Sequence, residues 1–355
     1  MGHTPEILLS RFARPLLLGI GGGYDIFAGL PTYLDYCKLG KEPVLANLSF
    51  TRELEKKCEL SEEEFGFYAA RVRASDFTTD AFAVELGFPG NYFPEFHLSR
   101  WFKKNRQVDV PVFAIRLIAE PSASESLGIE TYSQALQRIV DRHQCDAIIL
   151  IDAGVDSLVI GDEEGLGTYA EDFMSLIASS RIGLPTYLQC VGLGTEAGIS
   201  VDDFLVNYAR HRKANGYLGA LDWLSGDENI VQYLDAVGSS VPQNSSIHSM
   251  IAAAITGEFG NRCPESLKKR GLDDGDVLVH PWMTLAFWFD AATVLSVRRF
   301  VAECSDASSL KDLDIRFDAA RKAHHLIDDN GCYIGKRPYS RHVDEILLSA
   351  FNKIT

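Results

Sequence analysis

The stretch Leu16-Leu17-Leu18-Gly19-Ile20-Gly21-Gly22-Gly23-Tyr24-Asp25 has the pattern of a buried strand that ends in a glycine-rich turn. An apolar segment over 26–39 follows, so the pattern predicts strand, turn and helix in that order. Glycines let the backbone bend sharply and approach a ligand, and a helix start offers free N–H groups. The stretch therefore predicts an anion-binding turn, with Gly21, Gly22 and Gly23 as ligand-binding residues.

The alternation of strand and helix continues along the chain. Short apolar runs bounded by Pro, Gly or polar residues predict strands at 43–50, 112–117, 147–151 and 186–191, with helical patterns between the later ones. This alternation favours right-handed crossovers and a parallel sheet. We therefore expect an α/β fold with a doubly wound, mainly parallel sheet in a three-layer αβα, Rossmann-like arrangement.

Beyond Gly216 the pattern becomes mainly helical. An amphipathic run over 285–304 predicts a long helix, and the apolar run Val277-Leu278-Val279 is a candidate last strand. We expect one α/β domain over 1–355, whose helical portion over 216–355 packs on the sheet. The 285–304 stripe could also serve dimerisation, which makes a homo-oligomer one expectation, although such stripes are more often core.

An aromatic segment precedes the 112–117 strand. It contains Phe88, Tyr92, Phe93, Phe96 and Trp101 among Pro and Gly residues without a clear period. These rings could cover a pocket as a lid, but packing of the segment on the core is the favoured interpretation.

Charge and targeting patterns exclude some partners. Lys and Arg number 34 against 49 Asp and Glu, a net charge of −15, so nucleic acid is not an expected partner. The seven cysteines are scattered and lack any C-x-x-C pair, which favours reduced thiols. Without a signal-peptide pattern over 1–14 or an apolar run near the ~20 residues of a membrane span, we expect a cytoplasmic protein without a membrane partner.

Three predicted strands end in turns that carry an acid. The first turn reaches Asp25, the second strand end reads Asp152-Ala153-Gly154-Val155-Asp156, and the third reads Gly192-Leu193-Gly194-Thr195-Glu196. Because the carboxyl ends of parallel strands meet at one edge of a sheet, we expect these turns to face one ligand. The candidate catalytic acids are Asp25, Asp152 and Glu196, and the further ligand-binding candidates are Gly154, Gly192, Gly194 and Thr195.

Carboxylates at such turns suit a hard divalent cation. Mg²⁺ takes oxygen ligands and often bridges to substrate phosphates. Asp152 and Asp156 flank a glycine-containing turn, and Glu163 follows in Gly161-Asp162-Glu163-Glu164-Gly165, so these three acids are the predicted metal ligands. The alternative is that one Asp caps a turn while the others are solvated. No organic cofactor is implied.

Two histidines are further candidates. His280 follows an apolar run and precedes Pro281-Trp282, so it could act as a catalytic acid or base, although a lone His beside Trp is more often a packed core residue. His248 lies near a predicted helix start and could donate to an anion. Capping of that helix by Asn244 or Ser245 explains the stretch equally well.

Several common catalytic motifs are missing. The chain has no Gly-x-Ser-x-Gly, and the Gly21–Gly23 turn lacks the Lys-Ser/Thr of a P-loop. Tyr24 breaks the G-x-G-x-x-G spacing of dinucleotide-binding folds. Serine hydrolases, conventional ATPases and dehydrogenases are therefore disfavoured.

Taken together, the motifs at 18–25, 151–156 with 161–166, and 191–196 resemble the family catalogued as domain of unknown function 1152. The resemblance covers most of the chain. Tyr24 and Val155 depart from it, because glycine is usual at both positions, and Thr195-Glu196-Ala197-Gly198 replaces the usual Asp-Gly-Glu. Since this family has no assigned reaction, the resemblance implies the fold and the site location rather than a mechanism.

Three functions remain open at this point. A small-molecule enzyme could bind a phosphorylated or nucleotide-like substrate and catalyse metal-assisted phosphoryl transfer or hydrolysis, which uses cation, positioning and backbone donors together. A metal-independent lyase or cyclase could instead use Asp25, Asp152 and Glu196 as acid and base on a carboxylate or amide substrate. The third is a non-enzymatic metabolite sensor or scaffold. The first is favoured.

Overall fold

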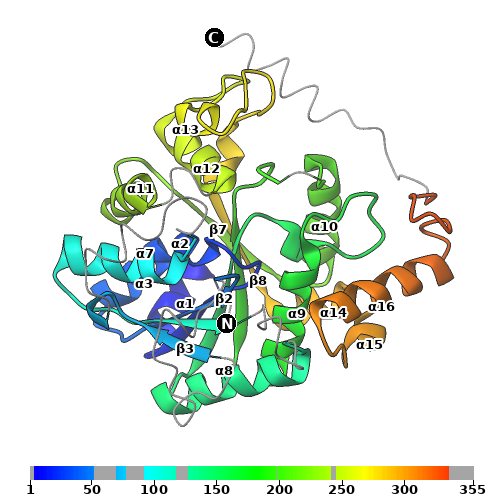
Figure 1. Cartoon of the computed structure of the whole chain (residues 1–355), viewed down its shortest axis with the longest axis horizontal. Helices are drawn as coiled ribbons and strands as arrows, with labels where there is room; N and C mark the ends of the chain where they lie inside the picture. The colour runs from blue at the N-terminus through cyan, green and yellow to red at the C-terminus, as the bar shows by residue number, and fades with distance from the viewer. Residues whose placement is uncertain are drawn as a thin grey trace.

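Strands from between Pro15 and Asp290 form one central sheet (Figure 1). The computed structural model describes residues 4–51, 69–76, 92–116, 127–196, 198–240 and 245–335. In these ranges eight strands pair in the order β3-β4-β2-β1-β5-β6-β8-β7. Their bounds are β1 Pro15–Gly19, β2 Val44–Ser49, β3 Ala69–Val72, β4 Val112–Arg116, β5 Ala147–Ala153, β6 Thr186–Val191, β7 Tyr217–Asp222 and β8 Leu285–Asp290.

Most neighbouring strands run parallel. The pairs within β4-β2-β1-β5-β6 are all parallel, whereas β3 pairs with β4, and β8 with β6 and β7, in the antiparallel sense. The mainly parallel sheet expected from the sequence is confirmed. The chain winds outward from β1 through β2 to β4 and then returns to β5, beside β1. This reversal creates a switch point between β1 and β5, the position at which open α/β sheets bind ligands.

Helices cover both faces of the sheet, because side chains alternate along each buried strand. Leu16 and Leu18 of β1 belong to the core on one face, and Leu17 to the core on the other. The first core includes residues of α8 Ile129–His143, α9 Tyr169–Ser180, α10 Val201–Lys213, α14 Ala291–Val297, α15 Val301–Cys304 and α16 Leu310–Ala323. The second includes residues of α1 Pro5–Arg11, α2 Asp25–Ala28, α3 Leu30–Lys38, α7 Pro94–Trp101, α11 Glu228–Ser240 and α12 Ser246–Thr256. The result is the expected three-layer αβα fold.

The remaining helical elements are short. They are the 3₁₀ turns Ala74–Asp76, Asp156–Leu158 and Pro281–Thr284, the π-helical turn Phe102–Arg106, and α13 Glu265–Lys268. With the part of α12 that is not against the sheet, α13 forms a separate small core around Met250, Leu267, Val279 and Met283. Figure 1 shows α12 and α13 projecting at the top of the molecule. We call residues 245–284 the cap. Among the described helices, none combines the length and apolar character needed to cross a membrane.

The predicted helix over 285–304 is wrong in its first third. This segment begins with β8 and continues as α14 and α15. β8 lies between β6 and β7 and its four central residues are buried, so both of its faces are apolar. A fully buried strand cannot be distinguished from a buried helix by its apolar pattern. The predicted strand at 277–279 is also wrong, because Val279 makes only an isolated bridge to Gly260.

The aromatic segment before β4 packs mainly on the core. Phe93 and Trp101 are fully or almost fully buried, and the ring of Phe96 stacks on Phe93. Phe88 lies outside the described residues. Tyr92 differs from the others because it lines a pocket at the carboxyl edge of the sheet.

Candidate functional site

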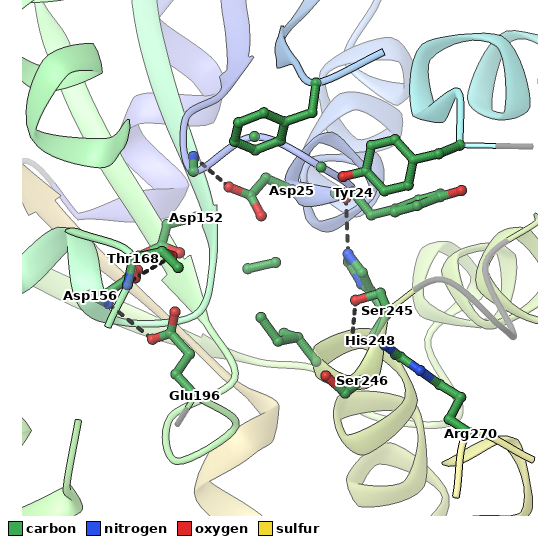
Figure 2. A pocket seen from close by; sticks show the side chains of 17 residues that line it. Tyr24, Asp25, Asp152, Asp156, Thr168, Glu196, Ser245, Ser246, His248 and Arg270 are labelled. Atoms are coloured by element: carbon green, nitrogen blue, oxygen red, sulfur yellow. Dashed lines mark hydrogen bonds between the residues drawn. The ribbon is translucent and has the colours of Figure 1, made fainter. Parts of the chain in front are cut away.

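A pocket of about 240 Å³ lies at the carboxyl edge of the sheet, at the switch point (Figure 2). The turn after β1, the end of β5, the turn after β6 and the cap all contribute to its wall. Figure 2 shows carboxylates on one side, from Asp25, Asp152, Asp156 and Glu196. The cap residues on the other side are Ser245, Ser246, Ile247, His248 and Arg270.

The glycines after β1 make room for two aromatic rings. Gly22 has φ +79°, and a Cβ there would lie 1.9 Å from the ring of Phe50. A Cβ on Gly23 would lie 2.6 Å from the hydroxyl of Tyr92. Both rings line the pocket, so the protein's own side chains use the space that the glycines leave.

The turn after β1 binds the carboxylate of Asp25, so its N–H groups are not all available to a ligand. The N–H of Gly21 donates to Asp25 Oδ2 at 2.6 Å, so it is already occupied. The helix predicted over 26–39 is divided into α2, which has only four residues, and α3. Gly21, Gly22 and Gly23 do line the pocket, but their main observed effect is to place the carboxylate of Asp25 there.

Two acids, one at the end of β5 and one just beyond it, are held by hydroxyl-bearing neighbours. Asp152 Oδ2 accepts hydrogen bonds from the hydroxyl and the N–H of Ser157. Asp156 Oδ2 accepts from the N–H and the hydroxyl of Thr168, at 2.7 and 2.8 Å. Within the described residues these bonds use Oδ2 alone. The carboxyl group of Asp156 also lies within hydrogen-bonding reach of the carboxyl groups of Asp172 and Glu196, so these acids can share a proton or a bound cation.

Glu196 lies in the turn after β6 and connects this turn to the one after β5. Its Oε2 accepts from the N–H groups of Val155, at 2.7 Å, and Asp156, at 3.1 Å. A Cβ on Gly154 would lie 2.4 Å from this carboxylate, so a side chain there would displace Glu196. Gly154 therefore acts by making room for an acid.

Asp172, on α9, is a fifth acid that the strand-end pattern does not identify. It is completely buried, and neither carboxylate oxygen receives a hydrogen bond from any described residue. The five acids form two sets with ligand atoms within 4.8 Å of one another, namely Asp25, Asp152 and Asp172, and Asp152, Asp156 and Glu196. The available sequence signal was a charged residue directly before the apolar run Phe173-Met174 of a predicted helix.

Burial and mutual repulsion make four acids of this cluster more basic than ordinary carboxylates. Burial raises the pKa of Asp25, Asp152, Asp172 and Glu196 above its ordinary range, and the charges of neighbouring acids raise it further. Buried Arg298 donates to the carbonyl oxygen of Asp156 at 3.3 Å. One guanidinium cannot balance five carboxylates, so the cluster favours bound cations or protons.

On the cap side, His248 is a structural residue. Its Nε2 lies 2.9 Å from the carbonyl oxygen of Tyr24, which can only accept, so Nε2 carries the proton. Its Nδ1 then accepts from the hydroxyl of Tyr233, at 2.8 Å. Burial lowers the pKa of His248 to about 4, which keeps the ring neutral. Capping of α12 by Ser245 is confirmed, because the Ser245 hydroxyl accepts from the N–H of His248.

The structure does not bring Glu163 to the other predicted metal ligands. Its carboxylate accepts from the N–H groups of Ile160 and Gly161, both at 2.7 Å, and from Asn207 Nδ2 at 2.6 Å. Glu163 belongs to neither set of acids and does not line the pocket. These hydrogen bonds hold the loop at Ile160 and Gly161 and connect it to Asn207.

The remaining predicted residues lie beside the pocket rather than in its lining. The N–H and hydroxyl of Thr195 both donate to the carbonyl oxygen of Gly192, which closes the turn on itself. His280 is buried next to this turn, where a Cβ on Gly194 would lie 2.5 Å from its Nε2. Neither ring nitrogen of His280 has a hydrogen-bond partner among the described residues.

We expect His280 to make the stability of the fold depend on pH. Burial lowers the pKa of His280 from 6.5 to about 4, so between these values the unfolded chain binds a proton that the folded chain does not. Stability contributed by this residue is therefore lost as the pH falls below about 6.5. His280→Phe should raise the free energy of unfolding, relative to wild type, by about 2 kcal/mol more at pH 5 than at pH 7.5. Urea unfolding at both values measures this difference, and an equal effect at the two would contradict it.

The part of the chain that carries four of the five acids matches a known family. A family model described as "Protein of unknown function (DUF1152)" matches residues 119–322, which is more than half of the 355 residues. The matched range contains Asp152, Asp156, Asp172 and Glu196, and starts after the turn that carries Asp25. No curated protein matches the chain.

Proposed function

The chain belongs to the DUF1152 family, whose description names no activity, and from its site we propose that it is a small-molecule enzyme. Its substrate is phosphorylated or nucleotide-like, and its reaction is metal-assisted phosphoryl transfer or hydrolysis. The observation that carries the proposal is the division of the pocket into an acidic side and a side formed by the start of α12 and Arg270.

The acidic side suits a hard cation. Asp25, Asp152, Asp156 and Glu196 offer only oxygen atoms, which are the preferred ligands of Mg²⁺. Mg²⁺ usually binds one or two carboxylates tightly, keeps some waters and bridges to substrate phosphates. Such a cation would also lower the repulsion within the cluster.

The cap side suits a phosphate group. Helix α12 has eleven residues, and its first residues, Ser246 and Ile247, line the pocket. The N–H groups at a helix start carry partial positive charge and bind phosphate oxygens. Arg270 adds a full positive charge on the same side, as Figure 2 shows. A phosphate between the two sides would contact both the cation and these donors.

The raised pKa values supply a base for the reaction. A carboxylate with a raised pKa accepts a proton more readily than an ordinary one, so Asp25 or Glu196, whichever does not bind the cation, can take the proton from an attacking water or hydroxyl. The same property supports a second candidate, a metal-independent lyase or cyclase in which protonated and ionised acids of the cluster act in pairs. Loss of turnover on addition of EDTA separates the first candidate from the second.

Calorimetry and turnover on the full chain test the proposal. We expect ATP, AMP or a sugar phosphate to bind in the presence of Mg²⁺ and to release or transfer phosphate in an EDTA-sensitive way. Absence of binding heat for all such compounds with Mg²⁺, or turnover unchanged by EDTA, would contradict it.

Arg270→Gln tests the phosphate side alone. Removing one charged donor is expected to weaken binding of the phosphorylated compound by about tenfold, since a hydrogen bond to a charged group contributes roughly 1.5 kcal/mol or more. Mg²⁺ affinity without substrate should not change. Lys269→Gln is the matched control, because Lys269 is exposed and does not line the pocket. Equal effects of the two substitutions would show that Arg270 contributes only long-range charge.

A further inference from the structure

We propose that the acidic cluster binds two divalent cations, an inner and an outer one, which share Asp152. The inner cation is held by Asp25, Asp152 and Asp172, and the outer one by Asp152, Asp156 and Glu196. This inference rests on the proposed function and specifies it, because phosphoryl-transfer sites can clamp their substrate with two cations.

The two sets lie at different depths. Asp152, Asp156 and Glu196 all line the pocket, so an outer cation would be accessible to a substrate. Asp172 is completely buried and is not among the lining residues. A cation held partly by Asp172 therefore lies farther from the substrate than the outer one.

Asp25 and Asp172 belong to different helices, and both carboxylates lie close to Gly21. Asp25 begins α2 and Asp172 lies in the first turn of α9. A Cβ on Gly21 would lie 2.8 Å from Asp25 Oδ2 and 3.0 Å from Asp172 Oδ1. The absence of a side chain at Gly21 thus leaves these two oxygens close to one another.

Asp172 provides an observation independent of the clustering itself. Neither of its buried oxygens has a hydrogen-bond donor among the described residues. Buried Glu163, in contrast, accepts three hydrogen bonds. A buried carboxylate without a partner is strongly unfavourable. Among the described residues only the carboxyl group of Asp156 lies within hydrogen-bonding reach of Asp172, so Asp172 requires a bound cation or a proton shared with Asp156.

Arg298 does not supply that partner. Its guanidinium lies over the ring of Phe173, 4.5 Å from the centroid, and its Nη2 donates to the carbonyl oxygen of Asp156. Its Nε and Nη1 make no hydrogen bond to a described residue. Arg298 contributes positive charge nearby, but among the described residues no N–H donor or basic side chain contacts Asp172 directly.

The donor set indicates the kind of cation. All five ligands are carboxylates, and hard oxygen sites without nitrogen or sulfur suit Mg²⁺ and Mn²⁺ rather than Zn²⁺ or Cu²⁺. The inner cation would neutralise Asp25 and Asp172 and fix the orientation of Asp152. The outer cation would contact the phosphate.

Mn²⁺ binding to the full chain, after removal of metals with EDTA, tests the inference. Calorimetry should give two Mn²⁺ per chain, and electron paramagnetic resonance should detect spin coupling, because Asp152 bridges the ions. Asp172→Asn should bind one Mn²⁺ without coupling and still bind phosphorylated compounds through the outer ion. Glu171→Gln is the matched control: the neighbouring residue loses a carboxylate outside both sets and should retain two coupled ions.

The outcomes separate this inference from the proposed function. One uncoupled Mn²⁺ in the wild-type chain, with phosphate-ester binding intact, overturns the inner site and leaves the function standing. No Mn²⁺ binding overturns both. The metal-free Asp172→Asn chain should also melt at a higher temperature than wild type, because one of the mutually repelling buried acids is removed. A lower melting temperature would assign Asp172 a structural role instead.

Discussion

Asp152→Asn is expected to remove Mn²⁺ binding at both positions and to abolish metal-dependent turnover. Asp152 is common to the two sets of acids, so the substitution takes a charged ligand from each. The affinity should fall by at least about 100-fold, which is the upper end of the range for losing a residue that only hydrogen-bonds to a metal ligand. Calorimetry on the EDTA-treated chain measures the affinity, and a phosphate-release assay measures the turnover.

Glu163→Gln is the control for this experiment. The sequence predicts Glu163 as a metal ligand, whereas the structure surrounds its carboxylate with three donors away from the pocket. The variant should bind Mn²⁺ as wild type does, although it should unfold more easily because charge-assisted hydrogen bonds are weakened. Normal Mn²⁺ binding by Asp152→Asn, or loss of binding in Glu163→Gln, would contradict the assignment of ligands.

Gly165→Ala is expected to lower the free energy of unfolding by about 3 kcal/mol or more. A Cβ on Gly165 would lie 1.6 Å from the carbonyl oxygen of Gly198 and 2.7 Å from its carbon. These are backbone atoms, so no rotamer change can relieve the overlap. The loop before Thr168 and the turn after Glu196 must separate, which should also weaken Mn²⁺ binding at the outer position.

Gly238→Ala is the matched control for Gly165→Ala. Gly238 lies within α11, and a Cβ there would meet nothing within 4 Å. Alanine in an exposed helical position is expected to stabilise the chain by roughly 0.5–1 kcal/mol. Urea unfolding compares the two variants. Similar stability of Gly165→Ala and wild type would show that the two loops are not in the contact described.

The parts of the site that follow strands were predictable from the sequence. Asp25, Asp152 and Glu196 each stand at the end of an apolar run, and parallel pairing places such ends at one edge. Asp172 was not predictable in this way, because its position depends on how α9 packs against the turn after β1. Arg270 belongs to the cap, whose placement over the sheet depends on long-range contacts that leave no local pattern.

The same distinction holds for the strands: some are predicted by their local sequence pattern, and others depend on distant neighbours. Alternation of short apolar runs with helical patterns predicts β2, β4, β5 and β6 within a few residues. The apolar pattern of β8 predicts a helix instead, because the neighbours β6 and β7 bury both faces of this strand. A strand with two buried faces loses the period of two by which strands are identified.

The positions of the five acids along the chain connect cation binding to the folding equilibrium. They come from α2, the region of β5, α9 and the turn after β6, so an unfolded chain does not hold them together. Cations that bind only the native chain shift the folding equilibrium by mass action, by about 2.7 kcal/mol at one hundred times the dissociation constant. Under the proposed cation binding, a chain deprived of divalent cations would spend more time unfolded and be degraded sooner, so its lifetime would depend on the supply of that cation.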